Sequence, residues 1–254
     1  LFALPQLNFK DYTARTTIKP DGTATLHLDF VASAAANVAG RLLAPDGRSA
    51  GDFEVALSAD GRGSSELVVS HPQLWTAESP WLYRLELELT SAGKAVQKFT
   101  DRIGLRQVTI EGGIFKLNGT PIKLRGVDHH DIWPEGRVAT EERMRRDLEL
   151  IRGANINFIR TSHYPPHPRL IEMCDEMGIY VDEEVPYIHG RENLKKSDYQ
   201  DALLTRARAT VMRDKNRPSV IFWSCGNENS ITKLGNNTAK CVKELDPTRP
   251  VTFP

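Results

Sequence analysis

The chain has 254 residues, enough for two domains of ordinary size, and its 40% hydrophobic and 26% charged residues are normal for a globular protein with a packed core. Lys plus Arg and Asp plus Glu each number 33, so the formal net charge is zero and provides no long-range attraction to nucleic acid or an anionic membrane. The sequence contains no run of about 18 apolar residues. We therefore expect neither nucleic acid nor a membrane as a partner.

The N-terminus and the cysteines carry no targeting or metal signal. Residues 1–5 lack an initiator Met and a charged segment leading into an apolar stretch, so we expect the chain to start inside a longer protein. The compartment is not indicated. Cys174, Cys225 and Cys241 cannot all pair within the chain and none lies in a CxxC motif, which favours buried free thiols.

The part of the chain up to residue 108 has the pattern of a β-sandwich. Residues 23–30 and 82–89 alternate between apolar and polar side chains, as expected for half-buried strands. Asp-Gly turn signals separate the runs, at Asp21-Gly22, Asp46-Gly47 and Asp60-Gly61. Since no helical pattern intervenes, we predict an antiparallel β-sandwich over residues 1–108.

After residue 110 the pattern alternates between strands and helices. The predicted strands are 121–127, 157–160, 179–183, 219–223 and 250–253. Thr140 is the predicted N-cap of a first helix that Gly153 closes, and further helices are predicted at 168–177, at about 198–215 and up to Leu245. Repeated β-α units indicate parallel strands joined by right-handed crossovers.

Two architectures fit repeated β-α units, an open doubly wound sheet and a (β/α)8 TIM barrel. Polar residues follow each strand, which favours a barrel because the carboxyl ends of barrel strands converge at one rim. These residues are Asp128, His129, His130, Arg160 to His163, Asp182 to Glu184, Asn227 and Glu228. No GxGxxG follows the first strand. We therefore predict that residues 109–254 form the N-terminal part of a TIM barrel. They supply about five of its eight β-α units, and we expect the others to lie outside the chain.

The most informative segment places Asn227 and Glu228 directly after the apolar strand 219–223. A Glu in a cavity mouth beside apolar neighbours is expected to be partly desolvated, which raises its pKa toward the range of a general acid at neutral pH. The alternative is that Asn227 and Glu228 simply begin a helix, where a carboxylate is favoured by the helix dipole.

This segment and its surroundings resemble glycoside hydrolase family 2, the β-galactosidase and β-glucuronidase family. The resemblance covers nearly the whole chain and keeps the order of the motifs. It is carried by residues 72–75, 80–83, 115–121, 125–130, 160–165, 174–183, 213–218 and 219–228. It implies that residues 1–108 form an immunoglobulin-like β-sandwich. It also implies a retaining β-glycoside hydrolase with two carboxylates in different roles, a nucleophile and a general acid/base.

The resemblance implies a role for individual residues. Glu228 matches the proton donor, and Asn227 matches the Asn that contacts the sugar 2-hydroxyl. The other implied substrate-binding residues are the rim histidines His130 and His163, Arg160 beneath the site, and the acidic pair Asp182 and Glu183 at the third strand end. The family's nucleophile lies on the seventh barrel strand, so none is assigned here, and we expect the 254 residues alone to be inactive.

A departure from the family pattern concerns magnesium. The magnesium-dependent β-galactosidases have Glu-x-His shortly after the acidic pair, whereas this chain has Tyr187, Ile188 and His189. Magnesium prefers carboxylate oxygens, so we expect no cofactor and no catalytic metal. The departure keeps β-glucuronidase and β-mannosidase open beside β-galactosidase, which is the activity that we expect.

Two other classes of protein remain alternatives. One is a non-catalytic carbohydrate-binding protein built on the sandwich, against which Glu228 and the rim histidines argue because such a protein needs no half barrel. The other is an unrelated barrel enzyme with His130, His163 and His189 as metal ligands. A carbohydrate substrate is the expected partner, and homo-oligomer formation by the full-length protein stays open.

Overall fold

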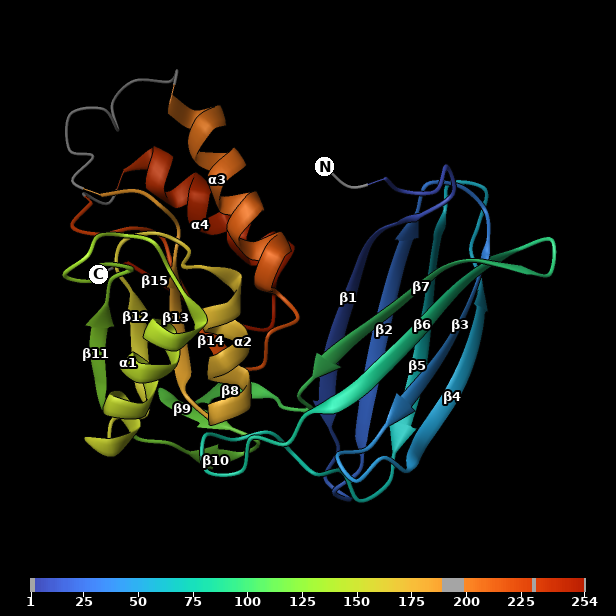
Figure 1. Ribbon diagram of the computed structural model, residues 1–254, viewed down its shortest axis with the longest axis horizontal. Coiled ribbons are helices and arrows are strands. Elements are labelled where there is room, and N and C mark those ends of the chain that lie inside the picture. Colours follow the sequence, from blue (N-terminus) through green and yellow to red (C-terminus); the bar gives the residue numbers. More distant parts are fainter. Residues whose placement is uncertain (1–2, 189–198, 230–231, 254) are drawn as a thin grey trace. The chain divides into compact units, whose positions relative to one another are not determined.

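The computed structural model describes residues 3–188, 199–229 and 232–253. The chain divides into two compact units. The first runs to Gln107 without the segment Ala77–Pro80, and the second comprises Ala77–Pro80 and the chain from Val108 onward. In Figure 1 the first unit consists of strands alone, and the second combines strands with helices.

The first unit is an antiparallel β-sandwich of two sheets (Figure 1). One sheet has the order β1-β2-β5 and the other the order β4-β3-β6-β7, and every strand pair is antiparallel. The strands are β1 (Phe9–Ile18), β2 (Ala24–Ala32), β3 (Asn37–Leu43), β4 (Ser49–Ala56), β5 (Arg62–Val69), β6 (Tyr83–Ser91) and β7 (Lys94–Ile103).

Alternation along the strands builds the core of this sandwich. In β6, Leu85, Leu87 and Leu89 are buried, while Glu86 and Glu88 between them face outward and are half-buried. Strand β2 contributes Leu26, Leu28 and Phe30 to the same hydrophobic cluster. Burying one such side chain contributes about 2 kcal/mol, so a period-two pattern on two sheets defines which faces meet. The predicted sandwich is confirmed.

The second unit contains a short antiparallel hairpin sheet and a parallel sheet with helices (Figure 1). The hairpin sheet consists of β8 (Val108–Glu111), β9 (Ile114–Leu117) and β10 (Thr120–Pro121). The parallel strands are β11 (Gly126–His129), β12 (Phe158–Thr161), β13 (Tyr180–Glu184), β14 (Val220–Ser224) and β15 (Val251–Thr252). Within the described residues, the helices between these strands are α1 (Glu141–Gly153), α2 (Pro168–Met177), α3 (Tyr199–Asp214) and α4 (Lys233–Leu245).

The order of the parallel strands decides between the two architectures. The strands lie side by side in chain order, β11-β12-β13-β14-β15, whereas a doubly wound sheet reverses its order partway along the chain. Helix α1 packs beside α2, and α3 packs beside α4 (Figure 1). This arrangement is the arc of an incomplete α/β barrel, as the polar strand ends predict.

The helix ends largely follow the predicted signals. The Thr140 hydroxyl accepts a hydrogen bond from the backbone N–H of Arg143, so Thr140 is the N-cap of α1. Helix α2 has the predicted bounds and ends at Gly178, whose φ of 72° is left-handed. Gly153 is the last residue of α1 rather than its cap, which is Ala154.

The first parallel strand was predicted too early in the chain. Pro121 belongs to the hairpin strand β10, residues 122–125 form no strand, and β11 starts only at Gly126. The Asn157 side chain is the physical reason, because it accepts from the backbone N–H of Arg125 and donates to the carbonyl of Lys123. These contacts replace the ladder hydrogen bonds that an earlier strand start requires.

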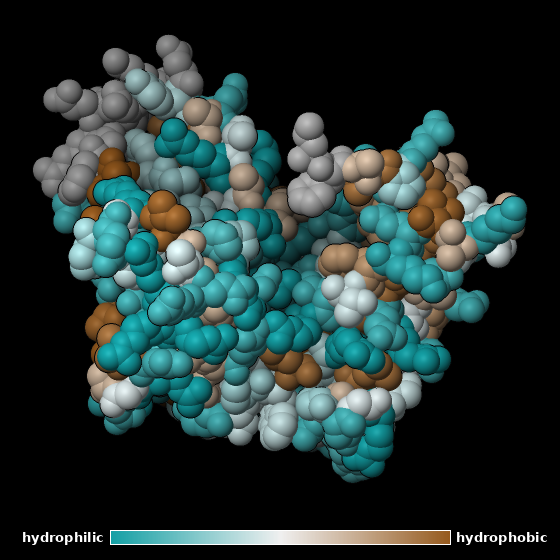
Figure 2. All heavy atoms as spheres, in the orientation of Figure 1, coloured by the Kyte–Doolittle hydropathy of each residue, from teal (hydrophilic) through white to brown (hydrophobic). Residues whose placement is uncertain are grey.

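The face of the molecule drawn in Figure 2 is mainly hydrophilic. Figure 2 shows hydrophilic residues over most of the visible surface, with hydrophobic residues in small separate groups. Among the described residues, no helix is long and apolar enough to cross a membrane.

Candidate active site

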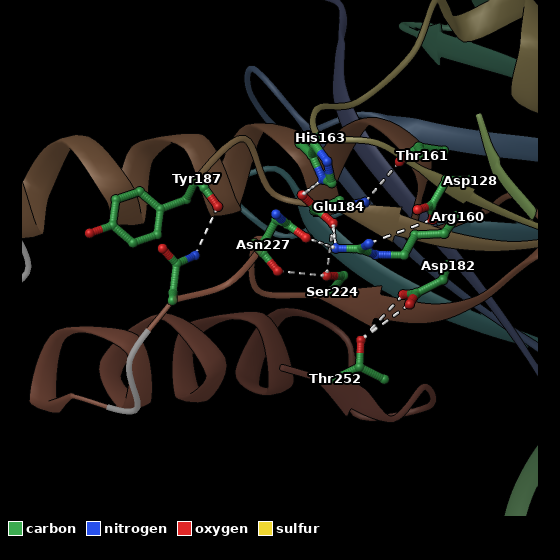
Figure 3. Close-up of polar contacts among 12 residues, drawn as sticks. Asp128, Arg160, Thr161, His163, Asp182, Glu184, Tyr187, Ser224, Asn227 and Thr252 are labelled. Atoms are coloured by element: carbon green, nitrogen blue, oxygen red, sulfur yellow. Dashed lines mark hydrogen bonds and ion pairs between the residues drawn. The ribbon is translucent and has the colours of Figure 1, made fainter. Parts of the chain in front are cut away.

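The inner face of the parallel sheet becomes polar toward the carboxyl ends of its strands. On β12 and β13, Ile159 and Val181 join the hydrophobic cluster with the helices, whereas Arg160 and Asp182 face the other way. A strand alternates its side chains between two faces, so one residue in two reaches the barrel interior. Figure 3 shows the polar side chains that meet there.

Arg160 is shared among acceptors from three strand ends. Its Nη2 donates to Glu184 Oε2 on β13 and, over 2.9 Å, to Asn227 Oδ1 in the loop after β14. Its Nη1 lies 3.6 Å from Asp128 Oδ1 on β11. A planar guanidinium can serve several oxygens at fixed angles, so Arg160 orients Asn227 relative to the sheet.

Glu184 is the acidic centre of this cluster. The sequence places it among the polar residues after the third strand, but it is not among the predicted substrate-binding residues. Its carboxylate is fully buried and contacts Arg160, His163 Nδ1 at 3.0 Å and the Ser224 hydroxyl at 3.3 Å. Burial raises the pKa of Glu184, and the neighbouring Arg160 and His163 oppose that rise. Strand alternation is the signal that could have identified Glu184, because Asp182 and Glu184 must face the same side of β13.

Asp182 and Glu183 do not act as a pair. Asp182 lies on the inner face, where the Thr252 hydroxyl donates to its carboxylate over 3.3–3.4 Å, and burial raises its pKa to about 7. Glu183 points to the helix layer, where Arg213 of α3 donates to it over 3.0 Å. Burial, and next the adjacent Asp214 carboxylate, raise the pKa of Glu183 well above its usual range. The geometry therefore places Asp182 near the cluster and Glu183 outside it.

The two rim histidines lie together. The rings of His130 and His163 pack edge to face with centroids 5.2 Å apart, and the Tyr164 ring lies 6.3 Å from His130. Burial, and next the His163 ring, lower the pKa of His130, which favours its neutral form. A neutral imidazole can donate one hydrogen bond and accept another, which suits a ligand with hydroxyl groups.

The loop after β14 presents Asn227 and Glu228 at the carboxyl end of the sheet. Asn227 is buried and its backbone N–H donates to the Tyr187 carbonyl over 2.8 Å. Glu228 is exposed, so the expected partial burial is not observed. Its φ of 50° is left-handed, and the loop does not continue as a helix directly from the strand.

Two possible oxygen ligands near the loop already have hydrogen-bond partners. Tyr187 offers a carbonyl that already accepts hydrogen bonds from Asn227 and Asn229, and Glu184 is held by Arg160 and His163. Within the described ranges, no group of three or more His, Cys, Asp or Glu residues could hold a metal ion. His189 lies outside the described residues. The expectation of no cofactor stays a prediction.

Both units match a known protein family. Residues 7–106 match the glycosyl hydrolases family 2, and residues 108–254 match the TIM barrel domain of the same family. A β-galactosidase of Photobacterium profundum is 41% identical over 207 residues, which cover 76% of this chain and 20% of that protein. A β-galactosidase of Vibrio vulnificus is 43% identical over 194 residues, which cover 74% of this chain and 19% of that protein.

Solved structures of β-glucuronidases resemble the whole chain. A Ruminococcus gnavus β-glucuronidase in complex with D-glucaro-d-lactam has a TM-score of 0.90 and 29% identity, over 99% of this chain and 43% of that chain. The β-glucuronidase of Dictyoglomus thermophilum has a TM-score of 0.88 and 26% identity, over 98% of this chain and 44% of that chain. The chain thus spans about a fifth of the curated relatives' length and less than half of these structures. By both its domains, the chain belongs to glycosyl hydrolases family 2.

Proposed function

We propose that the protein is a retaining β-glycosidase that acts on β-galactosides, with Glu228 as its general acid/base. The observation that carries the proposal is the placement of Asn227 and Glu228 at the carboxyl end of β14, with the Asn227 side chain held by Arg160. In a barrel enzyme this rim is where substrate and catalytic groups meet. The exposed Glu228 carboxyl is accessible to a glycosidic oxygen.

In the proposed reaction, Glu228 first protonates the leaving oxygen while a second carboxylate attacks the anomeric carbon. Glu228 then removes a proton from the incoming water as the glycosyl-enzyme is hydrolysed. No residue of this chain is assigned as the nucleophile. Asn227, fixed by Arg160, offers its amide to a sugar hydroxyl, and His130 and His163 contact the glycone.

A β-glucuronidase is the second candidate. The β-galactosidase relatives share about 40% identity with the chain, which favours galactose as the glycone. The β-glucuronidase structures extend over 98–99% of the chain at lower identity, which supports the alternative. The two readings differ in the glycone and keep the same role for Glu228.

The experiment uses the protein from its complete open reading frame. Aryl β-galactoside, β-glucuronide and β-mannoside are compared, and the galactoside is expected to have the largest kcat/KM. Glu228→Gln should lower kcat/KM for alkyl galactosides by about 10²–10⁴-fold, because proton donation to a poor leaving group is lost. The dinitrophenyl galactoside needs no proton, so its kcat/KM should change by less than about threefold. Added azide should accelerate turnover and yield a β-galactosyl azide.

The matched control is Glu244→Gln, because the Glu244 side chain is 65% exposed on α4. It should leave kcat/KM for both kinds of galactoside unchanged. Equal losses on both substrates with Glu228→Gln, and no azide product, would exclude the acid/base role. A larger kcat/KM for the glucuronide would replace galactose as the glycone.

A further inference from the structure

One backbone carbonyl accepts hydrogen bonds from the residue before Glu228 and from the residue after it. The Tyr187 carbonyl accepts a hydrogen bond from the backbone N–H of Asn227 over 2.8 Å and one from the Asn229 side-chain amide, also over 2.8 Å. Asn227 and Asn229 are the two neighbours of Glu228 in the chain. A carbonyl oxygen has two lone pairs, so a single acceptor can serve both donors.

The approach of the loop to Tyr187 is unusually close. Gly226 has a φ of 107°, and a Cβ atom on it would lie 2.2 Å from the Tyr187 carbonyl oxygen and 2.4 Å from Asn229 Nδ2. Only glycine fits there, because both the conformation and the space exclude a side chain. Ile188 and Asn227 also form an isolated parallel bridge, so two segments far apart in sequence meet at this point.

Glu228 itself has an uncommon backbone conformation. Its φ of 50° lies in the left-handed region, which a residue with a long side chain seldom adopts without support from its surroundings. In Figure 3 the Asn227 side chain lies by Arg160 and the Tyr187 ring is turned away from that cluster. The part of Tyr187 that meets the loop is therefore its carbonyl.

We propose that Asn229 is a positioning residue, whose amide fixes the direction of the Glu228 carboxyl by bonding to Tyr187. The proposal rests on the acid/base role proposed for Glu228. Without the amide, the backbone N–H of Asn227 still donates to the Tyr187 carbonyl, but residue 229 loses its side-chain hydrogen bond to the same oxygen. The hydrogen bond that holds Asn229 to the Tyr187 carbonyl is then lost, and we expect the Glu228 carboxyl to move relative to the leaving oxygen.

A misplaced acid has a specific kinetic effect. A displacement of about 1 Å in a catalytic group lowers the rate by about 10²-fold. The loss applies to proton donation, so it affects poor leaving groups in the first step and water activation in the second. For an activated substrate, slow hydrolysis of the glycosyl-enzyme lowers kcat and KM together and leaves kcat/KM unchanged.

The test compares Asn229→Ala and Asn229→Asp with unaltered protein from the complete open reading frame. Aspartate has the shape of asparagine and, when ionised, no donor, so both variants should behave alike. We expect kcat/KM for alkyl galactosides to fall by about 10- to 100-fold. For the dinitrophenyl galactoside, kcat/KM should stay within about threefold while kcat and KM fall together. Asn237→Ala, which removes an exposed amide bond to Gln200, is the matched control.

Glu228→Gln is measured in parallel to separate the two proposals. If it discriminates between leaving groups and neither Asn229 variant does, the positioning role is refuted and the acid/base role stands. If Glu228→Gln itself shows no discrimination, both proposals fall. An equal loss on both substrates with Asn229→Ala and Asn229→Asp also overturns the positioning role, because general damage to the fold does not distinguish leaving groups.

Discussion

The Arg160 guanidinium contacts both a buried carboxylate and a residue next to the proposed acid/base. It compensates the fully buried Glu184 carboxylate, and it fixes the side-chain oxygen of Asn227 next to Glu228. A buried ion pair adds little net stability over an apolar pair, but removing one partner leaves a charge without compensation. The contacts of Arg160 thus tie the geometry of the candidate site to the stability of the sheet.

This pairing predicts a non-additive effect of two substitutions. Arg160→Met should reduce the free energy of unfolding by about 3–5 kcal/mol, because the Glu184 carboxylate stays buried without its cation. Adding Glu184→Gln should restore about 1–3 kcal/mol. Amide hydrogen exchange in β13 measures both, with Arg41→Met as the control, since the Arg41–Asp52 pair is exposed to solvent and should contribute little to stability. Additive losses would contradict the proposed coupling.

The residues of the candidate site could be predicted only in part. Motif order identified Arg160, His163 and Asn227, which the structure brings into one cluster with Glu184. The choice between Glu183 and Glu184 depends on which residues of β13 face inward, and a shift of one residue reverses the assignment. The bond from Asn229 to Tyr187 joins segments about forty residues apart by a backbone carbonyl, for which no side-chain pattern gives a signal.

At the scale of elements, strands and helices with local signals were predictable. The bounds of α2 follow from Pro168 at its start and Gly178 at its end, both of which act through backbone conformation. The start of β11 was not predictable in this way, because it depends on the Asn157 side chain of a later segment. Local chemistry fixes helix ends, whereas strand ends depend on partners distant in the sequence.

Gly178 offers a test of one such helix end. A Cβ atom on Gly178 would lie 2.1 Å from the Ala77 carbonyl oxygen, whereas one on Gly112, which also has a left-handed φ, would meet no atom within 4 Å. Gly112→Ala should therefore reduce the free energy of unfolding by about 1–2 kcal/mol, which is the cost of the conformation alone. Gly178→Ala should reduce it by about 3 kcal/mol or more, because crowding adds to that cost.

Urea unfolding of the two variants, followed by hydrogen exchange in α2 and in the β8–β9 hairpin, measures these losses. The difference between the two losses in unfolding free energy measures the cost of crowding between a Cβ atom on residue 178 and the Ala77 carbonyl. Equal losses would mean that Ala77 moves away at little cost.

At the scale of the whole molecule, buried carboxyl groups set the dependence on pH. Burial raises the pKa of Asp175 to about 6 and that of Asp182 to about 7, and it also raises the pKa values of Glu183 and Glu184. All four belong to the second unit. Asp246 in the same unit has the opposite shift, because Arg249 and Thr248 hold its pKa below the usual range against the effect of burial.

The signs of these shifts predict a maximum of stability at mildly acidic pH. A carboxyl with a raised pKa binds its proton more tightly in the folded state, so its contribution is full below about pH 4 and is lost as the pH rises through its folded pKa. Asp246 acts in the other direction, and its contribution is lost only as the pH falls below about 4. The thermal midpoint should therefore decrease between about pH 5 and pH 8, a range over which Asp175 and Asp182 lose protons in the folded state.

Asp182→Asn tests the contribution of Asp182, whose pKa of about 7 in the folded state lies between about pH 5 and pH 8. The amide oxygen can still accept from the Thr252 hydroxyl, and it cannot ionise, so the slope of unfolding free energy against pH should become shallower by up to about 1.4 kcal/mol per pH unit between pH values of about 5 and 7. Calorimetry at several pH values measures the slope. Asp60→Asn is the control, because the Ser58 hydroxyl lowers the pKa of that exposed carboxyl, so it titrates below the range. An unchanged slope for Asp182→Asn would mean that Arg160 keeps the carboxylate ionised throughout.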